Sequence, residues 1–440
     1  MVTRRRFMAG AALGVAAASV ATRRLDAAER IRVGFIGVGN RGDQVLDAFL
    51  GQPDVEIPAI CDVYKPYLEA AARKAGGSPA LFSDHRALLD RKDLDAVVIA
   101  TPDHWHAIQT VDALRAAKDV YVEKPLSLTI SEGRRMVEEA RKAGRVVQVG
   151  IQRRSIDHCR RAAELVRSGG LGKVTVAKSY HVLNESPMGI GNTPPSPPPE
   201  GLDWDRWLGP APKVPYSANR CLYKFRWFWD YSGGQLTNFG THYLDQIQWS
   251  LGKSAPRSVT AVGGKLAIGD DREIPDTLEV AWVYEGGTLV TFSQYNLTGA
   301  PFNSKGSELE VRGNLGTLYL GYQGFEVVPE RLRLHPVPAR SPLDRNPPEG
   351  TETRIQPLKV AGTFGDATHA RNFLDCVKSR GKPSCDIETG HRSTSATLLG
   401  NIALRVGRTI EWDAERERIT NCPEANAYLA REYRAPWKLD

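Results

Sequence analysis

Glu123, Lys124 and Pro125 follow one another directly after the short apolar run 119–122. A lysine amine can take up or release a proton during a reaction when its pKa is close to the working pH, and burial shifts a lysine pKa in that direction. The proline ring locks φ and removes a backbone donor, so Pro125 is expected to fix the turn behind the amine. Glu123 is expected to set the neighbouring hydrogen bonds. The three residues therefore predict a strand end that positions Lys124 for proton transfer.

Residues 31–50 have the spacing of a nucleotide-binding turn. An apolar run at 31–36 leads into Gly37-x-Gly39-x-x-Gly42, and residues 43–50 continue as an amphipathic helix. Glycines in this context let the backbone approach a pyrophosphate, which rests on the helix N-terminus. We therefore predict a dinucleotide site whose phosphate cradle consists of Gly37, Gly39, Asn40, Arg41 and Gly42.

Asp62 ends the next apolar run, 25 positions after Gly37. A carboxylate at this place accepts hydrogen bonds from the ribose hydroxyls and repels the 2′-phosphate of NADP. The sequence therefore predicts NAD as the cofactor. Arg41 and Lys65 lie close enough in sequence to soften this preference, so NADP stays an alternative.

The elements that must position these residues fall into two groups. Apolar runs alternate with helical patterns of 10–15 residues up to about Gly150, which predicts a doubly wound parallel sheet of the Rossmann type. Later runs with glycine turns between them, including a hairpin at Gly286-Gly287, predict an α+β domain with a large, mostly antiparallel open sheet. We expect a nucleotide-binding domain at 29–152 and a substrate and oligomerisation domain at 153–440. The helices predicted near the end of the chain are candidates to pack back on the first domain.

Further polar residues are expected at the carboxyl edge of the first sheet, where such folds bind their ligands. Thr101 and Pro102 end the fourth strand, and the turn after it carries three large rings. The predicted cofactor contacts at this edge are Thr101, Pro102, His104, Trp105, His106, Glu123, Lys124 and Gln152. Gln152 and Arg153 follow the sixth strand and are candidates to contact either cofactor or substrate.

Three stretches together resemble one family. "ATPDHWHA" at 100–107, "EKP" at 123–125 and "GGQLTNFGTHYLDQIQWSLG" at 233–252 resemble the Gfo/Idh/MocA family, the relatives of glucose–fructose oxidoreductase and inositol dehydrogenase. The resemblance covers nearly the whole chain after residue 28, and residues 369–413 look like its exported subset. It implies that Lys124 lies beside the nicotinamide and the reacting hydroxyl, and that His242 completes the polar site. It also implies homodimers or homotetramers that form through the open face of the second sheet.

One position departs from the family pattern. Asn238 stands where the family motif has an aspartate, and an amide cannot take a proton. The resemblance then implies a relay shortened to Lys124 and His242. Asp245, one helical turn later, could compensate in part or could merely orient its helix.

Aromatic residues gather just before this motif. Four of the nine tryptophans lie between Trp204 and Trp229, with Arg220, Lys224 and Arg226 nearby. Aromatic faces beside hydrogen-bonding groups suit sugar rings, although such residues also pack domains and subunit interfaces. The candidate substrate contacts are Tyr223, Trp227, Asn238, His242 and Arg153.

The N-terminus is read as an export signal. Paired arginines before Phe7-Met8 and a small-residue apolar run at 9–21 predict a twin-arginine signal peptide at 1–28 and a periplasmic protein, with an ordinary secretory signal or a weak anchor as alternatives. The run is too short for a good membrane span. The signal carries +4 of the net charge of +7, and the remaining +3 gives no reason to propose nucleic acid as a partner.

The cysteines and histidines do not predict a metal site. No two of the six cysteines have C-x-x-C spacing. Cys376 and Cys385 could form a disulfide in an oxidising compartment. His104, His106 and His242 could form a metal cluster, but no carboxylate or cysteine spacing supports one.

Three functions remain open from the sequence. The first is an exported NAD(P)-dependent oxidoreductase acting on a secondary hydroxyl of a sugar or cyclic polyol, with Lys124 as acid and base. The second is glycoside cleavage with retained NAD, in which transient oxidation at C3 acidifies the C2 proton, elimination breaks the glycosidic bond and the carbon is then reduced again. Export favours this one, because free NAD is scarce outside the cytoplasm. The third is a non-catalytic sugar- or cofactor-binding protein, for which Asn238 is the hint.

Overall fold

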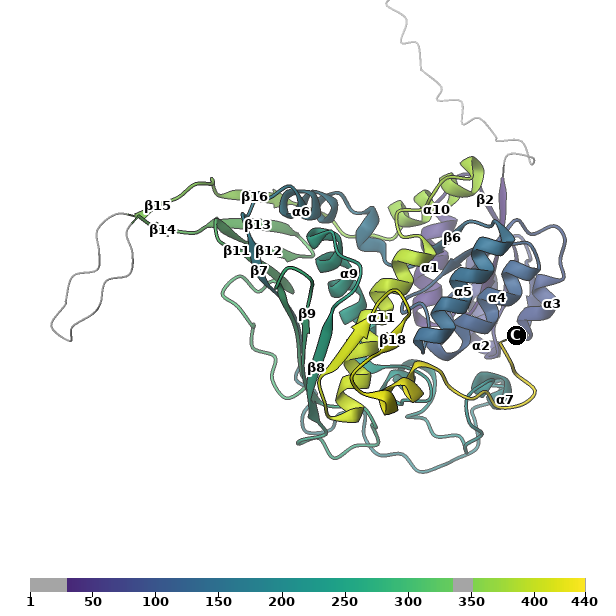
Figure 1. Cartoon of the computed structure of the whole chain (residues 1–440). Coiled ribbons are helices and arrows are strands. Elements are labelled where there is room, and N and C mark those ends of the chain that lie inside the picture. Colours follow the sequence, from purple (N-terminus) through teal and green to yellow (C-terminus); the bar gives the residue numbers. More distant parts are fainter. Residues whose placement is uncertain (1–29, 335–350, 440) are drawn as a thin grey trace, which may run out of the picture.

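The fold is taken from a computed structural model that describes residues 30–334 and 351–439. The predicted signal peptide therefore lies outside the described residues. Within them the chain forms two large sheets and one two-stranded sheet, with helices between and around the large ones (Figure 1).

The first sheet is the expected parallel sheet of the Rossmann type. Its six strands are ordered β3-β2-β1-β4-β5-β6, and every pair is parallel. The strands are β1 (Ile31–Ile36), β2 (Val55–Cys61), β3 (Ala80–Phe82), β4 (Ala96–Ile99), β5 (Asp119–Val122) and β6 (Val147–Val149). β4, β5 and β6 are buried along their whole length, as strands with helices on both faces should be.

Helices cover both faces of this sheet. They are α1 (Asn40–Leu50), α2 (Lys65–Ala75), α3 (His85–Leu89), α4 (His106–Arg115) and α5 (Ile130–Ala143). One face packs against α1 and α2 around Phe35 and Phe49, and the other packs against α3, α4 and α5 around Val97 and Met136. The doubly wound arrangement brings the carboxyl ends of β1, β2, β4 and β5 to one edge, where the predicted site residues stand.

The second sheet has ten strands and is mostly antiparallel, as predicted. Its order is β16-β13-β12-β11-β7-β10-β9-β8-β17-β18, and only β7 and β10 run parallel. The strands are β7 (Val174–Val182), β8 (Ser258–Gly264), β9 (Thr277–Val283), β10 (Leu289–Tyr295), β11 (Leu309–Gly313), β12 (Gly316–Gly321), β13 (Gly324–Pro329), β16 (Leu358–Ala361), β17 (Ile410–Asp413) and β18 (Arg418–Ile419). The hairpin expected at Gly286-Gly287 joins β9 to β10, and both glycines have positive φ. A separate pair, β14 (Leu332–Arg333) and β15 (Thr351–Glu352), extends beside it.

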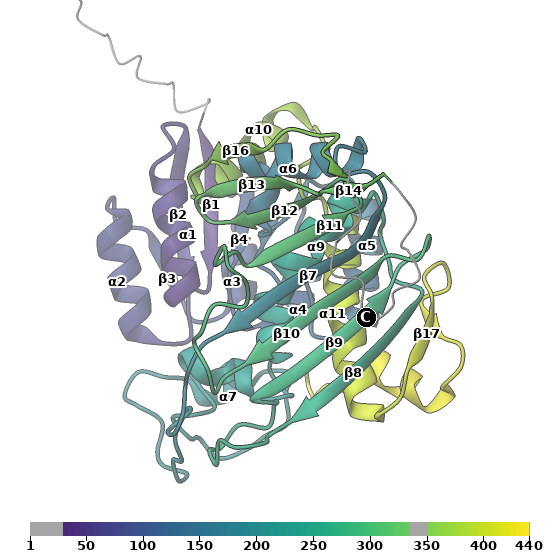
Figure 2. The same ribbon diagram turned by 90° about the vertical axis from the view of Figure 1, so that its left-hand side faces the viewer.

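Helices cover one face of the second sheet. α6 (Asp157–Arg167), α9 (Gly240–Leu251) and α11 (Ile387–Val406) lie between the two sheets, and Trp282 and Phe292 pack beneath them. Figure 2 looks at the other face, and among the described residues no helix lies in front of its strands. None of the helices in the described part is long and apolar enough to cross a membrane.

Two short helices, one longer helix and four 3-10 turns complete the described part of the chain. They are α7 (Trp204–Leu208), α8 (Gly234–Asn238), α10 (Ala367–Ser379) and the 3-10 turns η2 (Asp103–Trp105), η3 (Gln152–Ser155), η4 (Leu222–Trp227) and η5 (Pro423–Leu429). α10 packs against α1, and α11 packs against α5, so the C-terminal helices contact the first domain. The cysteines are all buried free thiols, and the Cys376–Cys385 disulfide considered from the sequence is not formed.

Candidate active site

An open cavity lies at the carboxyl edge of the first sheet and brings both domains together. One side comes from the ends of β1, β2, β4 and β5, and the other comes from the segments around α7, η4 and α8. Its lining includes Gly37, Gly39, Asn40, Arg41, Asp62, Tyr64, Tyr67, Asp84, Thr101, Pro102, Asp103, Trp105, Glu123, Lys124, Arg206, Trp207, Tyr223, Phe225, Arg226, Ser232, Asn238 and Trp437.

The glycine turn forms a close-packed cradle at one end of the cavity. Gly37 has φ +84°, and a Cβ there would lie 2.8 Å from the backbone of Ala100 and Thr101. A Cβ on Gly42 would lie 2.1 Å from the carbonyl oxygen of Gly37. α1 begins at Asn40 with no side chain capping its free N–H groups. Bare backbone donors at a helix N-terminus fit the pyrophosphate of a dinucleotide.

Asp62 stands at the end of β2, in the place that fits a ribose. Its carboxylate accepts hydrogen bonds from the backbone N–H groups of Val38, at 2.8 Å, and Tyr64, at 2.9 Å. Burial raises the pKa of Asp62 to about 6, against the lowering effect of these bonds. Each carboxylate oxygen keeps lone pairs for a further donor. The arrangement therefore fits the ribose hydroxyls of NAD.

Arg41 lines the cavity but is already engaged. Its guanidinium donates to Glu123 Oε1 at 2.9 Å and to both carboxylate oxygens of Asp366 at 2.8 Å. These ion pairs tie α1 to the end of β5 and to the start of α10. The side chain of Arg41 is therefore not directed to a 2′-phosphate. Lys65 is exposed and pairs with Glu69 at 3.7 Å.

Lys124 projects from the end of β5 toward the second domain. Its Nζ donates to Asn238 Oδ1 at 2.7 Å and to the Asn238 carbonyl oxygen at 3.0 Å. Burial lowers the pKa of Lys124 to about 8; Glu123 opposes the shift, and Arg226 adds to it. An amine with that pKa is close to the range that proton transfer needs at neutral pH.

Asn238 holds the amine without competing for its proton. Its Nδ2 donates to Gln235 Oε1 at 3.0 Å, which turns its own oxygen toward Lys124. Asp245 does not compensate for the missing aspartate. It is fully buried, accepts from Arg154 Nε at 2.9 Å and from Ser393 Oγ at 2.7 Å, and thus orients its helix.

His242 lies in the first turn of α9, just behind this contact. It is buried and does not line the cavity. Burial, followed by the charge of Lys124, holds the pKa of His242 well below its usual range, so the ring is neutral. Its Nδ1 has no hydrogen-bond partner among the described residues.

The rings after β4 are divided between the cavity and the core. Trp105 lines the cavity and donates from Nε1 to the Trp207 carbonyl oxygen at 2.9 Å. His104 and His106 do not line it, contrary to the sequence prediction. His104 Nε2 lies 3.1 Å from the same Trp207 oxygen, and the two nitrogens of His106 lie 2.8 Å and 2.9 Å from the carbonyl oxygens of Pro125 and Thr101. His106 thus joins the turns after β4 and β5.

Three other residues predicted to contact the cofactor or substrate do not line the cavity. Gln152 and Arg153 lie on η3, away from the cavity lining. Arg153 is buried, donates to Glu308 at 2.7 Å and stacks on Tyr243 at 5.2 Å. Trp227 is buried, with the guanidinium of Arg272 4.3 Å from its ring. Of the two predicted aromatic contacts to the substrate, the exposed Tyr223 lines the cavity and Trp227 does not.

The sequence analysis missed several lining residues. Asp103 is buried and accepts a hydrogen bond from Ser232 Oγ at 2.6 Å, and burial raises its pKa. Its position inside the "TPDHW" stretch was the available signal. Trp437 packs edge-on against Trp105, with ring centroids 4.7 Å apart. No sequence motif near Trp437 indicated that it would reach the cavity, because its partners lie more than 300 positions earlier in the chain. In the part of the chain that the structure describes, no group of three His, Cys, Asp or Glu side chains could hold a metal ion.

Two curated relatives match about a quarter of the chain. The glycosyl hydrolase family 109 protein 1 of Shewanella sp. (strain ANA-3) is 37% identical over 122 residues, which are 26% of this chain and 27% of that protein. The alpha-N-acetylgalactosaminidase of Shewanella oneidensis is 36% identical over 122 residues, with the same shares. The chain thus matches about a quarter of the length of these relatives.

Solved structures match nearly the whole fold. The WlbA dehydrogenase of Bordetella pertussis, in complex with NADH and UDP-GlcNAcA, superposes with a TM-score of 0.62 at 20% identity, covering 87% of this chain and 99% of that one. The aldose-aldose oxidoreductase of Caulobacter crescentus gives a TM-score of 0.62 at 19% identity with the same coverage. At this level of identity the likeness shows a shared fold.

Two family models cover most of the chain. Residues 31–151 match the oxidoreductase family, NAD-binding Rossmann fold, and residues 159–324 and 356–439 match the oxidoreductase family, C-terminal alpha/beta domain. Together with the glycine cradle, Asp62 and the strand end at Lys124, these matches show that the chain belongs to the Gfo/Idh/MocA oxidoreductase family and has an NAD-binding domain.

Proposed function

We propose that the protein is an NAD-dependent oxidoreductase that acts on a secondary hydroxyl of a sugar or cyclic polyol, with Lys124 transferring the hydroxyl proton. The observation that carries the proposal is the placement of Lys124. Its amine, with a pKa lowered to about 8, faces the same cavity as the glycine cradle and Asp62. A base and a dinucleotide site side by side are what alcohol oxidation needs, because both a proton and a hydride must leave the carbinol.

The residues divide the work as follows. The turn from Gly37 to Gly42 and the N-terminus of α1 would hold the pyrophosphate, and Asp62 would hold a ribose. Bound NAD supplies the hydride acceptor. Lys124 in its neutral form accepts the proton of the substrate hydroxyl, and Asn238 keeps the amine at the cavity wall. The same amine returns the proton when the reaction runs in reverse.

The aromatic residues in the wall opposite the glycine cradle support a carbohydrate as the substrate. Trp207, Tyr223 and Phe225 line it, and their faces can stack on the C–H faces of a sugar ring. Two proteins of similar fold have sugar ligands or sugar substrates in their descriptions. WlbA was crystallised with UDP-GlcNAcA, and the other is an aldose-aldose oxidoreductase.

Redox-neutral cleavage of a glycoside by retained NAD is the second candidate. One curated relative is named a glycosyl hydrolase family 109 protein, and another is named an alpha-N-acetylgalactosaminidase. The predicted twin-arginine export supports this candidate as well, since a closed redox cycle needs no supply of free NAD. Export itself remains part of the proposal, as does assembly into homodimers or homotetramers through the uncovered face of the second sheet.

The test is to incubate the purified protein with a panel of glycosides and free sugars, with and without added NAD, and to follow products and the absorbance at 340 nm together. Oxidation predicts a product and a stoichiometric rise in NADH. Redox-neutral cleavage predicts a released aglycone with no net NADH and no need for added NAD. Protein that binds NAD but changes no member of the panel under either condition would support a binding protein instead.

A further inference from the structure

Arg226 lines the cavity, and among the described residues it forms no ion pair with an acidic side chain. It lies on η4, and its guanidinium stacks 4.2 Å from the ring centre of Tyr223 and 5.6 Å from that of Phe225. All three side chains line the cavity together with Lys124 and Asn238. The cation is therefore presented at the end of the cavity where the proposed reaction takes place.

The other arginines of the lining are paired, and Arg226 is not. Arg41 donates to Glu123 and Asp366, and Arg206 lies 3.6 Å from Asp203 and donates to Ser83. Within residues 30–334 and 351–439, no carboxylate lies within 4 Å of the Arg226 guanidinium. A guanidinium has five donors, and stacking on an aromatic ring satisfies none of them.

The acids of the lining are already occupied. Asp62 accepts from the backbone N–H groups of Val38 and Tyr64, and Glu123 accepts from Arg41. Asp84 accepts from Arg86, and Asp103 accepts from Ser232. At the Lys124 end of the cavity, Glu123 and Asp103 act on the charge of Lys124, and Glu123 is already paired with Arg41.

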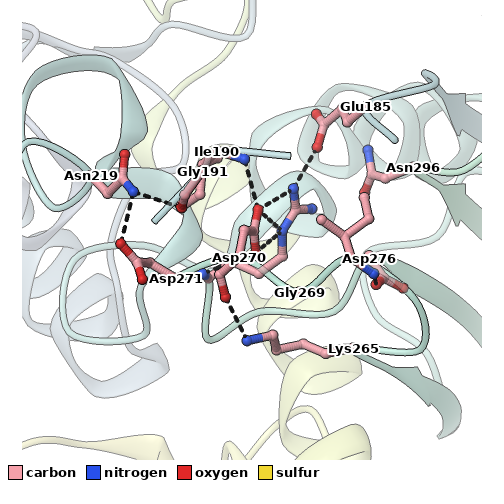
Figure 3. Close-up of polar contacts among 12 residues, drawn as sticks. Glu185, Ile190, Gly191, Asn219, Lys265, Gly269, Asp270, Asp271, Asp276 and Asn296 are labelled. Atoms are coloured by element: carbon pink, nitrogen blue, oxygen red, sulfur yellow. Dashed lines mark hydrogen bonds and ion pairs between the residues drawn. The ribbon is translucent and has the colours of Figure 1, made fainter. Parts of the chain in front are cut away.

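The segment that carries Arg226 is held firmly. Lys224 Nζ donates to Asn219 Oδ1 at 2.7 Å and to the Ile190 carbonyl oxygen at 2.8 Å. Trp227 packs on Arg272, whose guanidinium donates to Asp270 and Glu185 at 2.8 Å. Figure 3 shows the polar contacts around these supporting residues, with Asn219 bonded to Asp271 and Ile190 bonded to Asp270. A guanidinium on such a support is already oriented before any ligand binds, which lowers the entropy cost of binding.

We propose that Arg226 binds a carboxylate on the substrate, so that the natural substrate is an acidic sugar, such as a uronic or aldonic acid or its glycoside. The planar fork of a guanidinium matches a carboxylate with two parallel hydrogen bonds, and the stacked rings leave its edge open for them. The aromatic faces beside it suit the sugar ring that bears the acid. The inference rests on the proposed function and narrows its substrate class.

The nucleotide pyrophosphate is the competing partner for Arg226. The cradle for that group is formed by the opposite wall, at Gly37 and the start of α1, whereas Arg226 acts electrostatically on Lys124, Asp103 and His181. We therefore expect the charge of Arg226 to matter for the sugar and not for NADH.

The experiment compares acids with their uncharged amides on NADH-loaded protein. Titration calorimetry measures the affinities for D-glucuronate and D-glucuronamide, and for D-galacturonate and D-galacturonamide, in the wild type, Arg226→Gln and Arg226→Lys. Arg408→Gln is the matched control: it removes the same charge from an exposed surface pair with Glu424. The affinity for NADH is measured for each variant.

The wild type is expected to bind the acid of at least one pair about tenfold or more tightly than the amide, the scale of a charge-assisted bond. The ratio should fall to about one in Arg226→Gln, stay intermediate in Arg226→Lys, and be unchanged in Arg408→Gln, with NADH affinity constant.

Equal binding of acid and amide by the wild type, a preference that survives Arg226→Gln, or no binding of any acid would overturn the inference. A loss of NADH affinity in Arg226→Gln would assign the arginine to the nucleotide instead. None of these outcomes touches the proposed function, which the product and 340 nm assay tests on its own.

Discussion

The two walls of the cavity are built in different ways. The cofactor wall comes from one part of the chain, Gly37 to Lys124, and is built around the ends of strands and the start of α1. The opposite wall is assembled from Trp207, Tyr223, Asn238 and Trp437, which belong to segments far apart in the chain. The first wall depends on local backbone geometry, and the second depends on tertiary packing. Substitutions in the cofactor wall should therefore weaken nucleotide binding without changing substrate specificity, and substitutions in the opposite wall should do the reverse.

The largest effect on the cofactor wall is expected from Gly42→Ala. The added Cβ would lie 2.1 Å from the carbonyl oxygen of Gly37, so the turn and α1 must separate and the phosphate cradle opens. We expect NADH binding too weak to measure by titration calorimetry.

Gly51→Ala, at the far end of the same helix, is the control, because its Cβ would lie 3.5 Å from the nearest atom. If Gly42→Ala binds NADH like the control, the cradle does not hold the nucleotide.

Asp62→Ala should have a smaller effect on the same wall. Losing a charge-assisted hydrogen bond to the ribose should weaken NAD binding by roughly 1.5–3 kcal/mol. Binding of NADP should change less, and the wild type should prefer NAD, because Arg41 is engaged by Glu123 and Asp366. A wild type that prefers NADP would refute this interpretation of Asp62.

His242→Ala tests whether a residue behind the cavity acts with the opposite wall. The ring lies close to Lys124 but does not line the cavity, so we expect kcat to fall by about tenfold, below the 10²–10⁴ of a direct acid–base group. NADH affinity should not change. A loss as large as that of Lys124→Met would mean that His242 itself exchanges a proton.

Trp437→Leu should give the smallest effect. Its contacts with Trp105 and with Arg86 are worth about 1 kcal/mol of unfolding free energy by the usual scale of aromatic pairs. Chemical denaturation should show this loss while NADH affinity stays within about twofold. A collapse of NADH binding would instead show that the C-terminal segment closes over the nucleotide.

The same contrast explains which features could be predicted from the sequence. Strand periodicity and the glycine spacing followed by Asp62 are local signals, and they predicted the sheet type and the cofactor. The family was predicted from the resemblance of three short stretches, at 100–107, 123–125 and 233–252. Asp103 and Trp105 reach the cavity from one short turn, whereas His104 and His106 of that turn face inward. A motif indicates that residues lie near a site, but tertiary packing decides which way each side chain points.

Partners that are remote in the sequence explain why two other predicted contact residues do not line the cavity. Arg153 is held by Glu308, and Trp227 is held by Arg272, residues 155 and 45 positions away in the chain. An exposed aromatic stretch and a buried one look alike in sequence when the groups that bury them are remote. For the same reason, the unpaired state of Arg226 became visible only in the structure.

The most direct test of the central claim is the pH dependence of turnover for the wild type and Lys124→Met on a substrate found in the panel. Lys124 must be neutral to accept a proton, so kcat/KM for oxidation in the wild type should rise with pH and level off above about 8. Lys124→Met should lower kcat by about 10² or more, remove that rise, and leave NADH affinity unchanged. Near wild-type turnover with the same pH profile would contradict the account, because the proton would then pass through another group.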